Sequence, residues 1–223
     1  MPTLEDRMTT LAKPHVLFCV DLPKWAHDFK SQNLVKHLSA KYDCRIAYHA
    51  TLRAEDFEWA DVILIYFWMQ LEHLLPFVHL FKGKIVLCGI CGSVELEGSS
   101  RELGLNLLKK FPGVFIHNKM LYEEFKNEFS YKVYLNENGV DTTFYTPAVS
   151  RPSGIPLVVG WAGSLSNHGA ELRGYHNIIL PAVEQAPGVS LKVAAREDKW
   201  RGPEEMLEFY RDLDVYIVAS RSE

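Results

Sequence analysis

The feature that most constrains the fold of this chain is the alternation of short apolar runs with amphipathic stretches. Apolar runs of strand length recur at residues 15–20, 44–49, 61–67, 84–90, 113–117 and 132–135. Segments with helical periodicity lie among them, at residues 25–42, 70–82, 99–110 and 119–129. Strands that alternate with helices predict a mostly parallel sheet covered by helices on both faces.

A second and shorter series follows the first. It comprises strand patterns at 156–161, 189–195 and 214–219 and helical patterns at 175–186 and from Pro203 onward. Pro181 falls inside the first of these helices, where it predicts a kink or a start close to it. We therefore predict an α/β protein with one complete Rossmann-like parallel-sheet lobe and a partial second one. The predicted domains are residues 1–147 and 157–223, joined by a linker at 148–156 that is rich in turn-forming residues.

The segment between the two series, residues 136–147, is a candidate ligand-facing junction, because open α/β proteins bind ligands where such units meet. Asn138-Gly139 is a typical turn dipeptide, since glycine adopts positive φ without steric cost. Asp141 offers a carboxylate to nearby backbone N–H groups. The junction is therefore expected to contain a tight turn.

Composition excludes several classes of function. The net charge of −4 and pI of about 6.1 give no overall basic surface for nucleic acid. No apolar run reaches the roughly 18 residues that cross a bilayer, and Glu5 and Asp6 precede any apolar run, unlike in a signal peptide. Four cysteines fit a reduced compartment. We expect a cytoplasmic protein without a transmembrane segment or nucleic-acid partner, and peripheral membrane contact stays open.

Several segments, in this order along the chain, carry a resemblance to a known family. They are residues 21–28, 138–141 with Phe144 and Pro147, 158–164, 172–175 and 214–223. Together they resemble the retaining GT-B glycosyltransferases of the large group that includes bacterial sugar transferases of lipopolysaccharide, capsule and glycan assembly. The resemblance spans most of the chain.

The resemblance implies two Rossmann-like lobes, the first binding the acceptor and the second a nucleotide sugar. The implied reaction transfers a sugar to a hydroxyl of a glycan, lipid or protein with retention of configuration, in glycan or cell-surface polysaccharide synthesis. Such enzymes commonly stabilise the leaving diphosphate with backbone N–H groups and a cationic side chain. Neither a metal nor a cofactor is therefore expected.

The resemblance also implies donor-binding residues. Gly160 and Gly163 flank the end of the first strand of the second series, followed by Ser164, and their missing side chains would let phosphate approach the backbone. Arg173 matches the family's usual lysine before a glycine and would contact the diphosphate. The alternative is an ordinary strand-to-helix turn with a solvated arginine. Asn138, Gly139 and Asp141 are expected to shape the wall of the site.

This sequence departs from the family pattern at two places. Where many members carry a further arginine, Trp161-Ala162 stands, so Arg196 or Lys199 would have to assist. Glu223 matches the first glutamate of the family's Glu-x7-Glu motif, whose members contact the donor sugar and the nucleotide ribose, and it is therefore a candidate catalytic residue. The sequence ends before the second glutamate. We expect either a fragment of a longer enzyme or a natural truncation. The second hypothesis is an inactive remnant that serves as a binding or interaction module.

Candidate residues also occur in the first lobe. Trp25, His27 and Asp28 follow the first strand at the carboxyl edge of the sheet, where His27 is a candidate for binding acceptor hydroxyls. The alternative is that Trp25 packs, Asp28 caps a helix and His27 is merely exposed. Glu95 is a candidate for orienting the acceptor hydroxyl or stabilising positive charge on the sugar, with an exposed loop charge as its alternative.

Two further patterns in the first lobe have structural alternatives. His117-Asn118 ends another strand on the same edge and could also reach a ligand. Cys88 and Cys91 have the CxxC spacing of redox and zinc sites, but there is no second pair and no suitably spaced histidine. We therefore interpret Cys88 as a buried strand residue.

Overall fold

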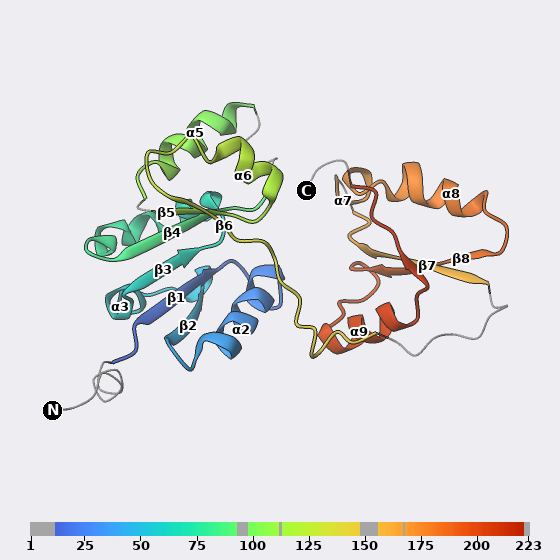
Figure 1. The fold of residues 1–223 in the computed structure, drawn as a ribbon, viewed down its shortest axis with the longest axis horizontal. Helices are drawn as coiled ribbons and strands as arrows, with labels where there is room; N and C mark the ends of the chain where they lie inside the picture. Colours follow the sequence, from blue (N-terminus) through green and yellow to red (C-terminus); the bar gives the residue numbers. More distant parts are fainter. Residues whose placement is uncertain (1–11, 93–97, 112, 148–155, 167, 221–223) are drawn as a thin grey trace. The chain divides into compact units, whose positions relative to one another are not determined.

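The computed structural model describes residues 12–92, 98–111, 113–147, 156–166 and 168–220 (Figure 1). The chain divides into two compact units, Met1–Asn138 and Gly139–Glu223. Each is an α/β layer structure of its own.

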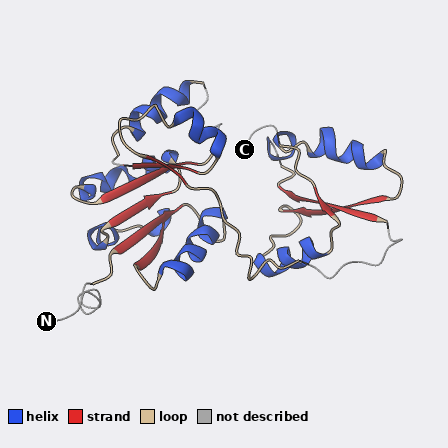
Figure 2. Cartoon of the chain, viewed as in Figure 1, coloured by secondary structure: helices blue, strands red, loops and turns tan. Residues whose placement is uncertain are grey.

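The first unit is built on a six-stranded sheet in the order β2-β1-β3-β4-β5-β6, with every neighbouring pair parallel (Figures 1 and 2). Its strands are β1 (His15–Val20), β2 (Asp43–Tyr48), β3 (Val62–Ile65), β4 (Ile85–Ile90), β5 (Gly113–Ile116) and β6 (Val133–Leu135). The chain leaves β1 to one side for β2 and returns on the other side as β3. The ends of β1 and β3 therefore form the topological switch point, where sheets of this kind bind ligands.

Helices cover both faces of this sheet, as the alternating pattern predicts. The helices are α2 (Ala26–Leu38), α3 (Ala54–Trp59), α4 (Leu71–Leu74), α5 (Ser99–Leu108) and α6 (Lys119–Phe125). Short 3-10 turns lie at His49–Thr51, Trp68–Gln70 and Leu75–Phe81. The predicted helix at 70–82 is thus broken into pieces, because Pro76 cannot continue an α-helical ladder. The sequence patterns missed α3, which is too short to show a periodicity.

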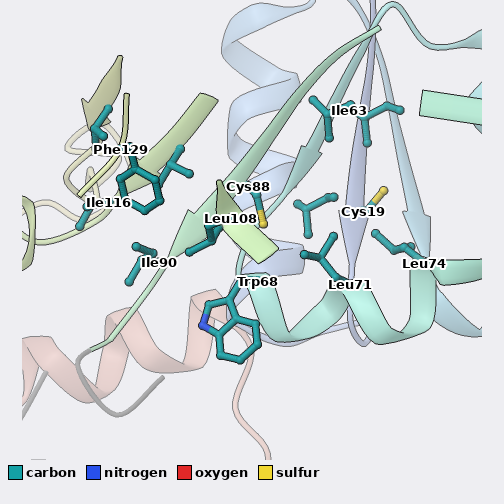
Figure 3. Packing of buried hydrophobic residues seen from close by; sticks show 14 of the residues in the cluster. Cys19, Ile63, Trp68, Leu71, Leu74, Cys88, Ile90, Leu108, Ile116 and Phe129 are labelled. Carbon is teal, nitrogen blue, oxygen red and sulfur yellow. The ribbon is translucent and has the colours of Figure 1, made fainter. Parts of the chain in front are cut away.

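The strand residues of the first unit alternate between two cores. Leu17 and Cys19 of β1 face the larger core, which Figure 3 shows with Ile63, Cys88 and residues of the covering helices. Val16, Phe18 and Val20 face the other side, where α2 packs. A buried parallel strand has apolar residues on both faces, and this explains why β1 reads as a continuous apolar run.

The second unit has a three-stranded parallel sheet in the order β8-β7-β9. The strands are β7 (Leu157–Gly163), β8 (Val189–Ala195) and β9 (Val215–Tyr216), and the helices are α7 (His168–Leu172), α8 (Leu180–Glu184) and α9 (Pro203–Arg211). A π-helical turn, Tyr175–Ile179, leads directly into α8, whose first turn contains Pro181. The irregularity predicted at Pro181 is therefore confirmed. Within the described residues, no helix is both long enough and apolar enough to cross a membrane.

The two parallel sheets with their covering helices confirm the predicted α/β fold class, a larger Rossmann-like unit followed by a smaller one. The junction differs from prediction. Asn138-Gly139 forms no turn, and Gly139 is not among the glycines with positive φ. Because the junction does not connect adjacent antiparallel strands, its backbone needs no hairpin there.

The turn of the junction occurs a few residues later, at Asp141. Its carboxylate accepts hydrogen bonds from the backbone N–H of Thr143 (3.0 Å) and from the Thr143 hydroxyl (2.6 Å). The following residues pack on α9, where Arg211 donates to the Thr146 hydroxyl (2.9 Å). These residues belong to the second compact unit, which begins at Gly139. The predicted linker lies outside the described residues except for Pro156.

Gly89 of β4 is the glycine whose replacement is expected to disturb the first unit most. A Cβ atom there would lie 1.9 Å from the Tyr66 carbonyl oxygen and 2.6 Å from the Phe115 ring. We predict that Gly89→Ala lowers the free energy of unfolding by about 3 kcal/mol, because backbone and a packed ring must both move. Urea unfolding monitored by circular dichroism measures this.

Gly139→Ala is the matched control for that measurement. A Cβ at Gly139 meets no atom within 4 Å, and the backbone has no positive φ. Gly139→Ala should leave stability unchanged or raise it by a few tenths of a kcal/mol, because alanine restricts the unfolded chain. A marked loss at Gly139 would instead support the turn expected from the sequence.

Candidate functional site

The second unit contains a pocket of about 410 Å³ at the carboxyl ends of its three strands. Gly163 ends β7, Arg196 directly follows β8, and Tyr216 ends β9. The wall is completed from the loops and from α9; its described residues are Ala162, Gly163, Ser164, Arg173, Ala194, Arg196, Lys199, Trp200, Arg201, Met206, Tyr210 and Tyr216. Parallel strands end at one edge of a sheet, so residues far apart in sequence meet there.

The charge of this wall is one-sided. Among the described lining residues, four side chains are cationic, at positions 173, 196, 199 and 201, and none is a carboxylate. The Arg201 guanidinium is held in place because it donates to the carbonyl oxygens of Ala195 and Lys199, both at 3.1 Å. Lys199 also pairs with Glu205 from α9. Such a wall favours an anion with several oxygens, such as a diphosphate.

Two glycines position Arg173 against the end of β7. A Cβ at Gly163 would lie 2.8 Å from the Trp161 ring and 3.2 Å from Nη1 of Arg173, so the guanidinium lies close over the backbone. Gly174 follows Arg173 with φ +65°, and a Cβ there would lie 2.7 Å from the Ala219 carbonyl oxygen. Only glycine fits this left-handed and crowded position. The structure thus brings Gly163, Ser164 and Arg173 together.

Gly160 does not join them. It lies buried in the middle of β7, and a Cβ there would meet the Leu213 side chain at 2.0 Å. Its missing side chain makes room for Leu213 and not for a phosphate. The sequence pattern predicted a strand that ends at residue 161, which placed Gly160 near its end. In the structure β7 continues to Gly163, so Gly160 lies inside the strand.

Glu197 organises the loop beside the pocket and was not anticipated from the sequence. Its carboxylate accepts hydrogen bonds from the Ser164 hydroxyl and from the backbone N–H groups of Leu165 (2.8 Å) and Ser166 (3.2 Å). These bonds, with that of the Ser164 hydroxyl the strongest, lower the pKa of Glu197 to about 2. The sequence did contain a signal for this role of Glu197. Its carboxylate comes just after β8, and the loop after β7 lies at the same edge of the sheet.

Aromatic side chains form another part of the pocket wall. The rings of Tyr210 and Tyr216 meet edge to face with centroids 5.3 Å apart. Burial, together with the neighbouring tyrosines, raises the pKa of Tyr210 to about 12, so its hydroxyl stays neutral. Trp200 is 43% exposed and offers an indole face on which a planar ring can stack.

The predicted junction residues do not line this pocket. Asn138 is the last residue of the first unit, and Gly139 is the first residue of the second. Both are exposed. Asp141 serves the local turn described above. Two of the predicted catalytic residues, Glu95 and Glu223, lie outside the described residues.

His27 lies at the switch point of the first unit, in the first turn of α2. Its ring stacks on Tyr66, which follows β3, with centroids 4.8 Å apart and an interplanar angle of 10°. Burial lowers the pKa of His27, while the nearby Asp21 carboxylate opposes this shift. The alternative in which His27 is merely exposed is therefore wrong, since only 13% of its side chain is accessible.

Of the two residues that flank His27 in the prediction, Asp28 is buried and Trp25 is partly exposed. Asp28 is buried and accepts hydrogen bonds from the Lys24 N–H (2.6 Å) and the Tyr48 hydroxyl (2.9 Å). It holds the β1–α2 loop, in which Lys24 has a φ of +63°. Strained residues of this kind cluster at functional sites. Trp25 is 41% exposed.

The two residues after β5 are also explained. The Nδ1 atom of His117 lies 2.8 Å from the Asn136 carbonyl oxygen, and burial lowers the pKa of this histidine to about 4. Asn118 caps α6, accepting hydrogen bonds from the backbone N–H groups of Met120 (2.7 Å) and Leu121 (3.3 Å). Within the described residues, no group of histidine, cysteine or carboxylate side chains could hold a metal ion.

Comparison with known proteins gives a fold relationship. No family model and no curated protein sequence matches the chain. Among solved structures, the chain is similar to HepE (Alr3699) from Anabaena, whose crystal structure was determined in complex with UDP and glucose. The TM-score is 0.59 at 13% sequence identity, and the alignment covers 92% of this chain and 69% of the HepE chain. The fold is GT-B-like, with two Rossmann-type lobes.

The Glu197 hydrogen bonds predict a defined pH dependence of stability. Since the pKa of Glu197 in the folded protein, about 2, lies below its ordinary value of 4.5, its carboxylate stabilises the fold above pH 4.5. That contribution is lost as the pH falls toward 2. We predict that Glu197→Gln lowers the melting temperature at pH 6 and that the difference from wild type shrinks toward pH 2.

The control for this experiment is Glu184→Gln on the exposed side of α8. Melting curves of the three proteins between pH 2 and 6 make the comparison. A difference between wild type and Glu197→Gln that stays constant over this range would show that the hydrogen bonds do not depend on the ionised carboxylate.

Proposed function

We propose that this protein transfers a glycosyl group from a nucleotide sugar to a hydroxyl acceptor, and that the pocket of the second unit binds the nucleoside diphosphate. The observation that carries this proposal is the cationic pocket at the carboxyl ends of β7, β8 and β9. The likeness of the fold to HepE, whose structure contains UDP and glucose, supports the choice of ligand.

The cations suit the chemistry of the leaving group. When the bond between sugar and diphosphate breaks, negative charge builds on the diphosphate, and fixed cations stabilise that charge most effectively in a partly enclosed site. Arg173, held over the end of β7, would contact the diphosphate through two N–H groups at once. Arg196 and Arg201 would supply further positive charge from the loop after β8. We propose that these side chains take the role that a metal ion plays in other enzymes of this chemistry.

The aromatic part of the wall suits the nucleoside. Trp200 would stack on the base, while the hydroxyls of Tyr210 and Tyr216 would form hydrogen bonds with the ribose or the base. The pocket volume of about 410 Å³ is within the usual range for small-molecule sites.

The finer features of the reaction follow from the sequence resemblance. We propose retention of configuration by front-side attack, in which the departing diphosphate accepts the proton of the acceptor hydroxyl. His27 would orient the acceptor in the first unit, and Glu95 would orient the acceptor hydroxyl or stabilise positive charge on the sugar. Glu223 would contact the donor, as the resemblance implies for the glutamates of its motif. Synthesis of a glycan or cell-surface polysaccharide is the proposed setting.

Binding of diphosphate is tested by substitution of Arg173. Arg173→Ala should weaken the binding of UDP and of pyrophosphate alike, each by about tenfold to a hundredfold, because a charge-assisted contact is lost. Arg173→Lys should lose less, since it keeps the charge but not the paired N–H groups. Isothermal titration measures the affinities, with Lys119→Ala in the first unit as control.

Recognition of the nucleoside is tested separately at Trp200. Trp200→Ala should weaken the binding of UDP by about tenfold, the scale of a lost base-stacking contact, and leave pyrophosphate binding unchanged. Equal losses for both ligands would contradict the stacking role.

The proposed function as a whole is tested by thermal shift and turnover. A nucleoside diphosphate that binds the folded protein must raise its melting temperature. If neither UDP, GDP and ADP nor the corresponding nucleotide sugars raise the melting temperature, the proposal is overturned. Binding without release of nucleoside diphosphate in the presence of acceptors would instead support the inactive binding module.

A further inference from the structure

The thiol of Cys91 has no part in the proposed glycosyl transfer, although it lies beside His27, the residue proposed to orient the acceptor. It follows the last residue of β4 and is partly exposed, beside the end of β3. The thiol donates to the Tyr66 carbonyl oxygen (3.1 Å), and Nε2 of His27, 3.7 Å from Sγ, is a second group within reach of the same proton. The absence of a side chain at Gly89 permits the close approach of β4 to Tyr66 that creates this position.

The imidazole of His27 is held in one orientation. Its ring stacks on Tyr66, and the Ser31 hydroxyl connects the two residues through the His27 carbonyl oxygen (2.8 Å) and the Tyr66 hydroxyl (2.7 Å). Its Nε2 lies 3.7 Å from Sγ of Cys91, and its buried Nδ1 lies 3.4 Å from Oδ2 of Asp21, an ion-pair distance at which it makes no hydrogen bond among the described residues. A thiol, an imidazole and a carboxylate thus stand in the order typical of an activated nucleophile.

A second histidine provides an acceptor beside this site. The backbone N–H of His117 bonds to the Ile90 carbonyl oxygen (3.3 Å), which sets His117 next to Cys91 across the ends of β4 and β5. His117 is 8% exposed, and its Nε2 is buried without a hydrogen-bond partner among the described residues. Such an atom favours a ligand that brings an N–H or O–H group.

We propose that Cys91, His27 and Asp21 form a nucleophilic thiol site that adds to α,β-unsaturated carbonyl compounds, amides in particular. His27 Nε2 accepts the proton of the thiol, and Sγ forms a bond to the β-carbon. The π electrons of the carbon–carbon double bond move toward the α-carbon, which takes the proton from the imidazolium. The product is a thioether. The addition releases no leaving group and needs no oxidant or reductant. Asp21 is a positioning residue that orients His27.

The electrostatics agree with this role of His27. Burial lowers the pKa of its imidazole and so favours the neutral ring, whose Nε2 can accept a proton in the tautomer that carries its hydrogen on Nδ1. The Asp21 carboxylate acts in the opposite direction and stabilises the imidazolium that forms transiently. The other titratable groups that face this region are Lys30, His49, Tyr66 and His117.

The remaining cysteines lack these features and serve as internal controls. Cys19 and Cys88 are fully buried, and both belong to the larger core (Figure 3), whereas the residues of α2 pack on the other face of the sheet. The two thiols of the CxxC pattern therefore lie on different faces of the sheet and are not placed as a redox pair. Cys44 is partly exposed, and burial together with the Asp43 carboxylate raises its pKa.

The test is the rate at which acrylamide modifies each cysteine in the folded protein, measured by peptide mass spectrometry. At pH 7, Cys91 should react at least about tenfold faster than Cys44, because its proton has an acceptor in place. His27→Asn should bring Cys91 down to about the rate of Cys44 and leave Cys44 itself unchanged. Equal rates in the wild type, or an unchanged rate in His27→Asn, would overturn the proposal.

Asp21→Asn tests the positioning role. It also keeps the proposal testable if His27→Asn does not fold. Misfolding of that variant would be revealed by modification of Cys19 and Cys88, which are buried in the folded protein. The Asn side chain can retain the hydrogen bond from the Leu22 N–H to Oδ1 (2.8 Å). Loss of the carboxylate should reduce the rate of Cys91 and shift the acid limb of its pH profile to lower pH, since the carboxylate raises the pKa of His27. An unchanged profile in Asp21→Asn would contradict the assignment.

Discussion

Parallel pairing of strands is the constraint on which the sites of this protein depend. Because the strands of each sheet run in the same direction, all of their carboxyl ends reach one edge, and the loops that follow them are brought together. In the first unit this edge carries Asp21, His27, Tyr66 and Cys91, which come from three different loops or helix starts. In the second unit the corresponding edge carries the cationic pocket.

Glycines at a few positions allow the close contacts found at these sheet edges. Gly89 lets β4 approach the Tyr66 carbonyl oxygen, and Gly163 lets the Arg173 guanidinium lie over the end of β7. Gly174 takes a left-handed conformation that other residues adopt only under strain. Gly160 has a different purpose, since it makes room for Leu213 within the core. Glycines near a site therefore serve packing as often as they serve a ligand.

Sequence patterns predicted the elements better than the contacts between them. The fold class, the strands of both sheets and the irregularity at Pro181 were predicted, because apolar periodicity and proline act locally. The turn predicted at Asn138-Gly139 does not form, because the preference of this dipeptide for a turn is weak without an antiparallel strand pair to connect. Of the predicted donor residues, Gly163, Ser164 and Arg173 meet in one pocket and Gly160 does not. Glu197 was missed because its partners lie on a different loop.

The sequence by itself determined that this chain forms two successive α/β units, since the alternation of buried strands and amphipathic helices has few other solutions. It also determined which residue types follow each strand. Only the tertiary structure decided which of these residues act together, because strand order and register set the neighbours at the sheet edge. Thus Arg173, Arg196 and Arg201 share one wall, and Cys91 meets His27, although neither association is visible in the spacing of residues along the chain.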